Sequence, residues 1–309
     1  MILCIGTTPA AQRVMVFNQL LNDEVNRAMT CLDGVAGKSV NVAKVLRALG
    51  ESVHATGFLG GDRGKEILAA LEARGISSDF VGVEARTRQC ITVIDKSTGT
   101  ITELVEESRP VSPTDYLRLL EIIRARASGS CSLVMSGTIT PGGPVDFYRQ
   151  CTLIAHQAAA LPVVDAQGPV LLEALNARPG LVKPNRTELA ATVGHELKDE
   201  PGVISAMRQL RDLGAERVVV TAGQGPTLAF DGRTVWRIQS PSVTAVNPIG
   251  SGDAFTAGLV WRLVHGDDLG EACRWAAAAG AANALTLMAG ELQRADVEAL
   301  AAAVVVERL

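Results

Sequence analysis

The sequence predicts an α/β fold in which a mostly parallel sheet carries helices on both faces and a second, small sheet is added. Two observations predict it. Patterns of buried strands alternate with helical patterns along most of the 309 residues, and two β-rich segments interrupt this alternation. Strands separated by helices of this length form parallel pairs, and the crossover helices then cover both faces of the sheet. We expect one α/β domain over residues 1–309.

The alternation starts with a short apolar run at 2–6, ILCIG, which is typical of a buried strand. The next segment has helical spacing, because Val42, Val45, Leu46 and Leu49 fall on one face and Gly50 follows as a stop. Later elements are expected in this order: strand 53–60, helix 64–75, strand 131–137, helix 144–160, strand 162–168, helix 169–177, segment 180–185, helix 200–214, strand 217–223 and helix 254–264. The alanine-rich segment 275–290 suits a tightly packed helix.

Two segments depart from this rhythm. Residues 13–35 and 87–108 are β-rich, and the second has the pattern of a hairpin that turns at KSTG, 96–99. We expect insertions at about 12–35 and 86–109 to form a small sheet that serves as a lid. The alternative is an edge extension without a functional role.

Ligands of open parallel sheets bind at the carboxyl ends of the strands. In this chain those ends are followed by loops that contain GTT, SGT, DAQG, KPN and TAGQG. We therefore expect the chemistry in these five loops.

Composition excludes several classes of protein. The hydrophobic fraction is 47%, the charged fraction is 20% and the net charge is −4, which fits a globular chain. No basic block occurs, so nucleic acid is not an expected partner. The six scattered cysteines form no metal or disulfide pattern, and we expect buried thiols in a reducing cytosol. The first residues resemble a strand and not a signal peptide, no window suits a membrane span, and a cytoplasmic location follows as the expectation.

The triplet Gly37-Lys38-Ser39 matches the end of a nucleotide-binding P-loop. The complete motif, G-x-x-x-x-G-K-[ST], needs a glycine five residues before Gly37, and that position is Leu32. The triplet is therefore not predicted to hold a nucleotide.

A stronger signal is NPIGSGDAFTAG at 247–258. Gly250, Ser251 and Gly252 form a turn that opens a helix, where unpaired N–H groups and the helix dipole favour an anion. Asp253 lies in the first turn, where a carboxylate either caps the helix or accepts a proton from an attacking hydroxyl. An anion site beside a base is what phosphoryl transfer requires.

This stretch resembles the C-terminal signature of the ribokinase-like (PfkB) family of carbohydrate kinases. The resemblance extends along nearly the whole chain, because GFLGGDRG, SGT, KPNRTE and VVVTAGQGP occur in the expected order. EVNRA, TRQCI and NPIGSGD look most like the branch that phosphorylates sugar phosphates, 1-phosphofructokinase and tagatose-6-phosphate kinase. The resemblance implies a ribokinase-like fold, ATP and Mg²⁺ as cofactors and, as in some family members, a homodimer formed through the lid.

The resemblance also implies residue roles. Asp253 is the expected general base, and Gly250, Ser251 and Gly252 form the expected anion hole. Asn185 and Glu188 match the N-x-x-E motif that organises Mg²⁺ and the triphosphate, with Glu188 acting on the metal indirectly. The other expected ATP-binding residues are Lys183, Thr221, Gly223, Gly225 and Asn283.

On the acceptor side, cations are needed for an existing phosphate, and Arg27, Lys38 and Arg88 occupy matching positions. The other expected substrate-binding residues are Gln12, Gly37 and Asn41. Gln12 stands where the family has an Asp, and Ala36 and Ser39 stand where its sugar-phosphate branch has glycines. Each of the two glycine replacements adds a Cβ, so the backbone approaches a ligand less closely.

The sequence leaves three functions open. The first is ATP-dependent phosphorylation of a ketohexose phosphate such as fructose 1-phosphate, fructose 6-phosphate or tagatose 6-phosphate. The second keeps the chemistry but uses an unphosphorylated sugar or a nucleoside as acceptor. The third is a non-catalytic sugar or nucleotide binder on a kinase scaffold, although the intact GSGD motif argues against it.

Overall fold

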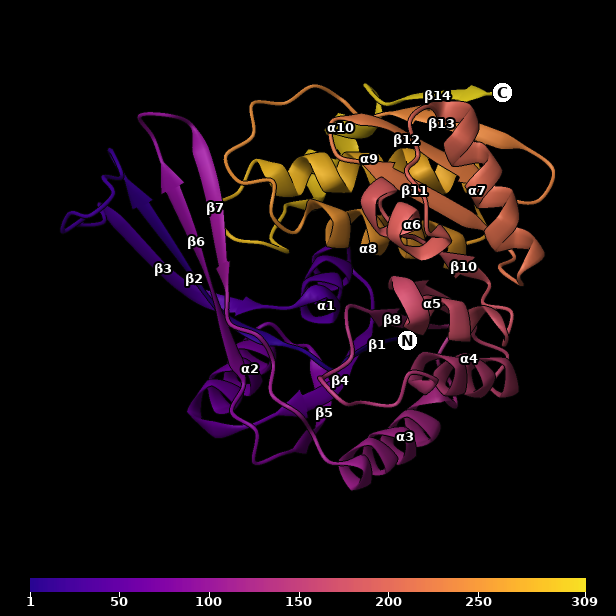
Figure 1. Cartoon of the computed structure of the whole chain (residues 1–309), viewed down its shortest axis with the longest axis horizontal. Helices are drawn as coiled ribbons and strands as arrows, with labels where there is room; N and C mark the ends of the chain where they lie inside the picture. Colours follow the sequence, from indigo (N-terminus) through magenta and orange to yellow (C-terminus); the bar gives the residue numbers. More distant parts are fainter.

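The computed structural model describes residues 1–309 and has the predicted α/β architecture (Figure 1). Its main sheet contains ten strands in the order β14-β13-β12-β11-β10-β9-β8-β1-β4-β5. The strands from β11 to β5 in this order are parallel, and the other three are antiparallel. The strands of this sheet are β1 (Ile2–Gly6), β4 (Val53–Leu59), β5 (Ser77–Gly82), β8 (Ser132–Ser136), β9 (Leu161–Asp165), β10 (Leu181–Val182), β11 (Val218–Ala222), β12 (Gly225–Phe230), β13 (Val235–Gln239) and β14 (Val305–Arg308).

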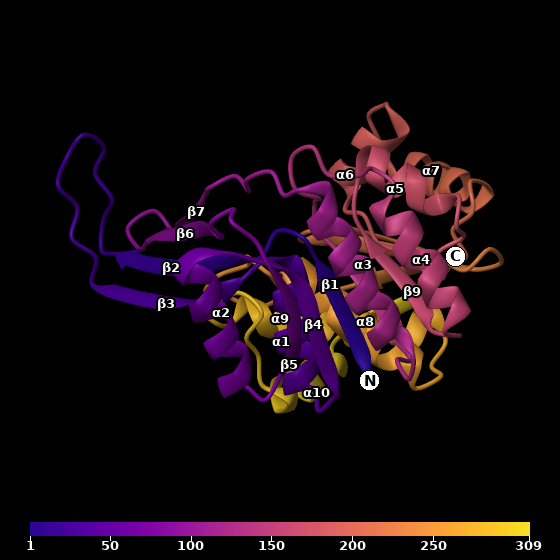
Figure 2. The same cartoon turned by 90° about the horizontal axis from the view of Figure 1, so that it is seen from below.

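Helices cover both faces of the sheet (Figure 2). One layer contains α1 (Lys38–Ala48), α2 (Gly61–Ala73), α8 (Ser251–Val264), α9 (Leu269–Ala284) and α10 (Arg294–Ala301). The other contains α3 (Pro113–Ala127), α4 (Phe147–Gln157), α5 (Gly168–Leu175), α6 (Arg186–Val193) and α7 (Glu200–Asp212). The central strand β1 shows why both layers are needed, since Ile2 and Cys4 belong to the first core and Leu3 and Ile5 to the second.

The two β-rich insertions form one separate sheet, as predicted. It has the order β3-β2-β6-β7 and contains β2 (Ala10–Phe17), β3 (Thr30–Ala36), β6 (Arg88–Asp95) and β7 (Thr100–Val105). The hairpin of β6 and β7 turns at 96–99, where Asp95 pairs with Thr100. This four-stranded sheet, called the lid sheet below, extends away from the α/β body (Figures 1 and 2). Strand β2 starts after the carboxyl end of β1, β3 ends just before α1, and β6 starts beside the carboxyl end of β4, where the Thr87 N–H donates to Gly60 O.

Some predicted details are corrected. The helix expected at 144–160 is shorter, because Ala159 adopts a left-handed φ of 53° that ends α4. The alanine-rich helix starts earlier, at Leu269, because Asp268 caps its first turn by accepting a hydrogen bond from the Glu271 N–H. Not all the cysteines are buried, since Cys31 and Cys131 are exposed. None of the helices has both the length and the apolar composition needed to cross a membrane.

Candidate active site

The first turn of α8 is the centre of the candidate site. Gly250 precedes the helix with a left-handed φ of 86°, and a Cβ there would lie 2.8 Å from that of Ala289, so both conformation and space require glycine. The backbone N–H groups of Gly252 and Asp253 donate no hydrogen bond within the chain. Donors left free at a helix start, together with the helix dipole, create a site for an anion.

Asp253 lies beside these donors and is almost fully buried, with 8% of its surface exposed. Its Oδ2 accepts a hydrogen bond of 2.7 Å from Asn41 Nδ2 on α1. Burial, helped by the negative charge of Asp165, raises the pKa of Asp253 to about 6, although Lys38, Asn41 and Lys183 act in the opposite direction. Asp253 is therefore ionised at neutral pH, and its pKa is close to that of an effective general base.

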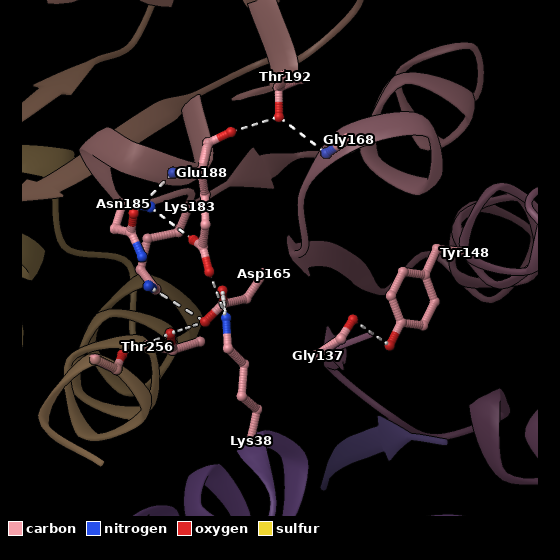
Figure 3. Close-up of polar contacts among 11 residues, drawn as sticks. Lys38, Gly137, Tyr148, Asp165, Gly168, Lys183, Asn185, Glu188, Thr192 and Thr256 are labelled. Carbon is pink, nitrogen blue, oxygen red and sulfur yellow. Dashed lines mark hydrogen bonds and ion pairs between the residues drawn. The ribbon is translucent and has the colours of Figure 1, made fainter. Parts of the chain in front are cut away.

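A charged network surrounds Asp165, which ends strand β9 (Figure 3). Lys38 Nζ and Lys183 Nζ each lie 3.2 Å from an oxygen of this carboxylate, and Thr256 Oγ1 donates to it over 2.8 Å. Burial raises the pKa of Asp165, but the two ammonium groups outweigh it and bring the pKa down to about 2. The positive charges of both lysine side chains act on Asp253, which lies beside the anion site.

Glu188 connects this network to α6. Its Oε2 accepts from the Asn185 backbone N–H and Asn185 Oδ1 accepts from the Glu188 N–H, both over 2.8 Å, so the N-x-x-E motif is a capping box. The other carboxylate oxygen, Oε1, lies 3.0 Å from Lys38 Nζ. Burial lowers the pKa of Lys38, but Asp165 and Glu188 outweigh it and hold the pKa above its ordinary value.

The predicted nucleotide-binding residues divide into three groups. Lys183 and Glu188 belong to the charged network around Asp165 and Lys38. Asn185, Thr221, Gly223 and Gly225 line one cavity of about 430 Å³ at the hairpin between β11 and β12. Asn283 lies elsewhere and is fully buried. Its Nδ2 donates to Ile249 O and Ser251 Oγ and its Oδ1 accepts from the Gly290 N–H, so it supports the anion-hole loop from behind.

The predicted acceptor residues are also spread over the site. Arg88 lines a small hollow at the root of the lid sheet, and its Nε donates to Thr8 O over 3.2 Å. Arg86 and Arg109 line the same hollow, together with the hydroxyl groups of Thr7 and Thr140. Arg88 and Arg109 form no ion pair, and the one ion pair of Arg86 is with Glu106, at 3.7 Å. The hollow therefore holds three guanidinium groups, of which only Arg86 pairs with a carboxylate.

Lys38, predicted to bind the same phosphate, lies in the Asp165 network instead of this hollow. Arg27 is exposed in the segment between β2 and β3, which projects beyond the end of the lid sheet (Figure 2). The structure of one chain therefore does not bring Lys38, Arg27 and Arg88 together. Gly37 is the residue before α1, the helix that supplies Lys38 and Asn41 to the site.

Comparison with known proteins identifies the family. A model described as pfkB family carbohydrate kinase matches residues 1–293. The chain is a pfkB family carbohydrate kinase. Its sequence resemblance to this family is thereby confirmed.

Solved structures of similar proteins agree with this family assignment. A Thermotoga maritima protein described as "Possible 1-phosphofructokinase" is 25% identical, with a TM-score of 0.92 over 100% of this chain and 99% of that one. Escherichia coli phosphofructokinase-2 in complex with fructose 6-phosphate is 26% identical, with a TM-score of 0.88 over 97% and 98% of the two chains. Arabidopsis thaliana ribokinase, at 21% identity and a TM-score of 0.77 over 97% and 98%, shares the fold.

Gln12 occupies a position where this chain differs from the family pattern, and the structure shows its surroundings clearly. Its side chain is 2% exposed, and neither Nε2 nor Oε1 has a hydrogen-bond partner. Asn41 Oδ1 and Ser136 Oγ are likewise buried without a partner. Buried polar atoms are normally paired, so unpaired atoms on Gln12 and Asn41, both predicted to bind substrate, are what a sugar-binding surface would show before its ligand binds.

The sequence did not indicate four residues of the candidate site, one of which is Arg86 in the arginine hollow. Asp165 and Thr256 belong to the charged network, and Arg109 lines the arginine hollow. The sequence places the loop DAQG at a strand end, and the Asp at its first position is the signal that could have identified Asp165. Arg109 gave no such signal, because it follows β7 in an irregular segment.

Proposed function

We propose that this kinase transfers the γ-phosphoryl group of ATP to a hydroxyl of a phosphorylated ketohexose, with Asp253 as the general base. The observation that carries the proposal is the pairing of a buried carboxylate with the two free N–H groups of the α8 start. Asn41 fixes the orientation of that carboxylate, and the raised pKa of Asp253 favours proton acceptance near neutral pH.

The reaction follows from this arrangement. The acceptor hydroxyl oxygen forms a bond to the γ-phosphorus, the bond from that phosphorus to the β,γ-bridging oxygen breaks, and ADP leaves. The hydroxyl proton moves to Asp253. The N–H groups of Gly252 and Asp253 stabilise the charge that develops on the transferring group, and Lys38 and Lys183 add positive charge nearby.

The donor set also fits Mg²⁺. Asp165 ends β9, Glu188 lies in the first turn of α6, and both carboxylates contact one cation, the Lys38 ammonium. Magnesium favours one or two carboxylates together with substrate phosphates, so these two residues are the ones that would hold it. When bound, the metal would neutralise charge on the β- and γ-phosphates.

A phosphorylated acceptor is favoured by the hollow of Arg86, Arg88 and Arg109. A guanidinium group can donate two hydrogen bonds to phosphate oxygens, and only one of these three side chains, Arg86, pairs with a carboxylate of the chain. The hollow measures about 20 Å³, so a phosphate enters only if the side chains move apart. Gln12 favours the second candidate, an unphosphorylated sugar or nucleoside, because it carries no charge where the family has a carboxylate.

Arginine substitution tests the choice between these acceptors. We expect Arg88→Ala and Arg109→Ala to raise KM for the phosphosugar by about tenfold or more each, since each removes a charged hydrogen bond, with a smaller effect on kcat. Arg118→Ala, on the exposed face of α3, is the matched control and should leave KM unchanged. Unchanged KM in both pocket variants would favour the unphosphorylated acceptor. Nucleotide binding without ADP release on any sugar would instead favour the non-catalytic binder.

We further propose that two lid sheets pair to form a homodimer. Val25, Met29, Leu104 and Val105 expose apolar surface on the lid, with Val25 80% exposed. Pairing would cover this surface and bring Arg27 of one copy towards the site of the other, which the single chain does not do. The similar Escherichia coli phosphofructokinase-2 has been described as tetrameric in its inhibited form. Sedimentation of the wild type against Val25→Asp tests the proposal, with a dimer converted to monomer as the expected result.

A further inference from the structure

Lys44 is a buried lysine outside the reaction centre. It lies on α1, one turn after Asn41, and only 2% of its side chain is exposed. Its ammonium group donates to Val35 O over 2.9 Å and to Ala289 O over 2.6 Å, and Glu291 Oε1 lies at 3.4 Å. All three protons of the ammonium group therefore face acceptors from two separate parts of the chain.

One of these parts is the loop at Ala289 and Gly290, which packs behind the reaction centre. A Cβ on Gly250 would lie 2.8 Å from Ala289 Cβ, so the loop touches the turn that opens the anion hole. A Cβ on Gly290 would lie 2.9 Å from Asn41 Cα, so the same loop also touches the residue that orients Asp253. A shift of this loop would move both partners of the proposed chemistry.

The other part is the lid. Val35 lies near the end of β3 and pairs with Ala11 on β2, next to the pair formed by Gln12 and Gly34. The bond from Lys44 to Val35 O therefore fixes the root of the lid sheet relative to α1. Both the lid and the loop are thus held by one side chain.

We propose that Lys44 is a positioning residue: its ammonium group holds the loop behind the anion hole and the root of the lid in the arrangement that phosphoryl transfer requires. The inference rests on the proposed roles of Asp253 and the anion hole. An apolar side chain of similar length would fill the space but leave two buried carbonyl groups without a donor, and buried acceptors without partners are unfavourable.

The charge on Lys44 provides a second route to a test. Burial lowers the pKa of Lys44 to about 8; Glu291 and Asp253 act against this effect and Arg74 acts with it. Arg74 also pairs with Glu291 at 2.8 Å. As the pH rises through about 8 the ammonium group loses its charge, its hydrogen bonds weaken and its new lone pair faces the Glu291 carboxylate.

The first experiment compares Lys44→Met and Lys44→Arg with Lys65→Met, a change at an exposed lysine of α2. We expect Lys44→Met to lower kcat about ten- to hundredfold with a smaller change in KM, because the groups that act in the transition state are displaced. Hydrogen exchange of residues 284–292 should rise in the same variant. Lys44→Arg, which keeps the donors and the charge, should recover part of kcat, and Lys65→Met should match the wild type in both measurements.

The second experiment keeps Lys44 and changes its half-exposed neighbours. Glu291→Gln removes the acidic neighbour, so the fall of kcat at high pH should move to lower pH. Arg74→Gln removes the basic neighbour, so the same fall should move to higher pH. Opposite shifts support the proposal. The proposal would be overturned if the high-pH fall of kcat did not move or moved in the same direction in both variants. It would also be overturned if Lys44→Met had the kcat and hydrogen exchange of the wild type. A fully active Asp253→Asn would overturn only the assignment of the base.

Discussion

Replacing Asp253 by Asn separates the function of this carboxylate from its effect on stability. The side chains have nearly the same shape, and Asn keeps an oxygen that accepts from Asn41 Nδ2. Asn carries no charge and takes no proton, so the variant resembles the wild type with Asp253 protonated. We expect turnover to fall by about 10²–10⁴, the usual contribution of general base catalysis, with little change in ATP binding.

The same change is expected to stabilise the fold. The pKa of Asp253 rises from its ordinary value of 3.8 to about 6 in the folded chain, so the folded state holds its proton more tightly than the unfolded state. Stability is therefore highest below the unfolded pKa and falls as the pH rises from about 4 to 6. The difference of about 2 pKa units corresponds to about 3 kcal/mol lost at neutral pH. A neutral Asn recovers up to this amount.

The assay measures urea unfolding of both proteins at about pH 7.5 and pH 5, together with ADP release. Linkage gives a stability gain for Asp253→Asn of about 3 kcal/mol at the higher pH and roughly half of that at the lower. Asn at an exposed acidic position, Asp62→Asn, is the control and should change neither stability nor turnover. Undiminished turnover, or a variant less stable than the wild type at both pH values, would refute the reasoning.

Three further predictions follow from the same contacts. In the wild type, kcat/KM should fall as the pH drops through about 6, because Asp253 must be ionised to accept a proton, and a profile flat down to pH 5 would contradict this. Lys38→Met should lower kcat more than it raises KM for the sugar phosphate, because Lys38 Nζ contacts Asp165 and Glu188. A change confined to KM would instead indicate that Lys38 binds the phosphate of the acceptor. Asp165→Asn should lower the free energy of unfolding in urea by about 3–5 kcal/mol at neutral pH, because it leaves buried Lys183 without its counter-ion. The pKa of Asp165 is lowered to about 2, so the wild type should lose this stabilisation as the pH falls from about 4 to 2.

Much of the fold was predictable because it depends on local patterns. The spacing of Val42, Val45, Leu46 and Leu49 predicts a helix, and all four are buried against the sheet. The hairpin of β6 and β7 was predictable from its turn residues. No pattern assigned β12, β13 and β14, since they are short strands at the edge of the sheet whose pairing depends on distant neighbours.

The candidate site was predictable only where its residues are adjacent in sequence. Gly250 to Asp253 form one turn, so four residues define its chemistry locally. The contact between Lys38 and Asp165 joins residues 127 positions apart, and spacing cannot show it. Lys38 was accordingly expected beside the acceptor phosphate, although the folded chain places it with Asp165 and Glu188.

We have proposed that this kinase phosphorylates a sugar that already carries a phosphate. The most direct measurement is ADP release with fructose 1-phosphate, fructose 6-phosphate, tagatose 6-phosphate and the corresponding free sugars, each at several concentrations with Mg²⁺ and ATP. We expect kcat/KM for at least one sugar phosphate to exceed that of its free sugar by about a hundredfold or more, which is the contribution of one or two charged hydrogen bonds. A free sugar that is used as well as every sugar phosphate would contradict it.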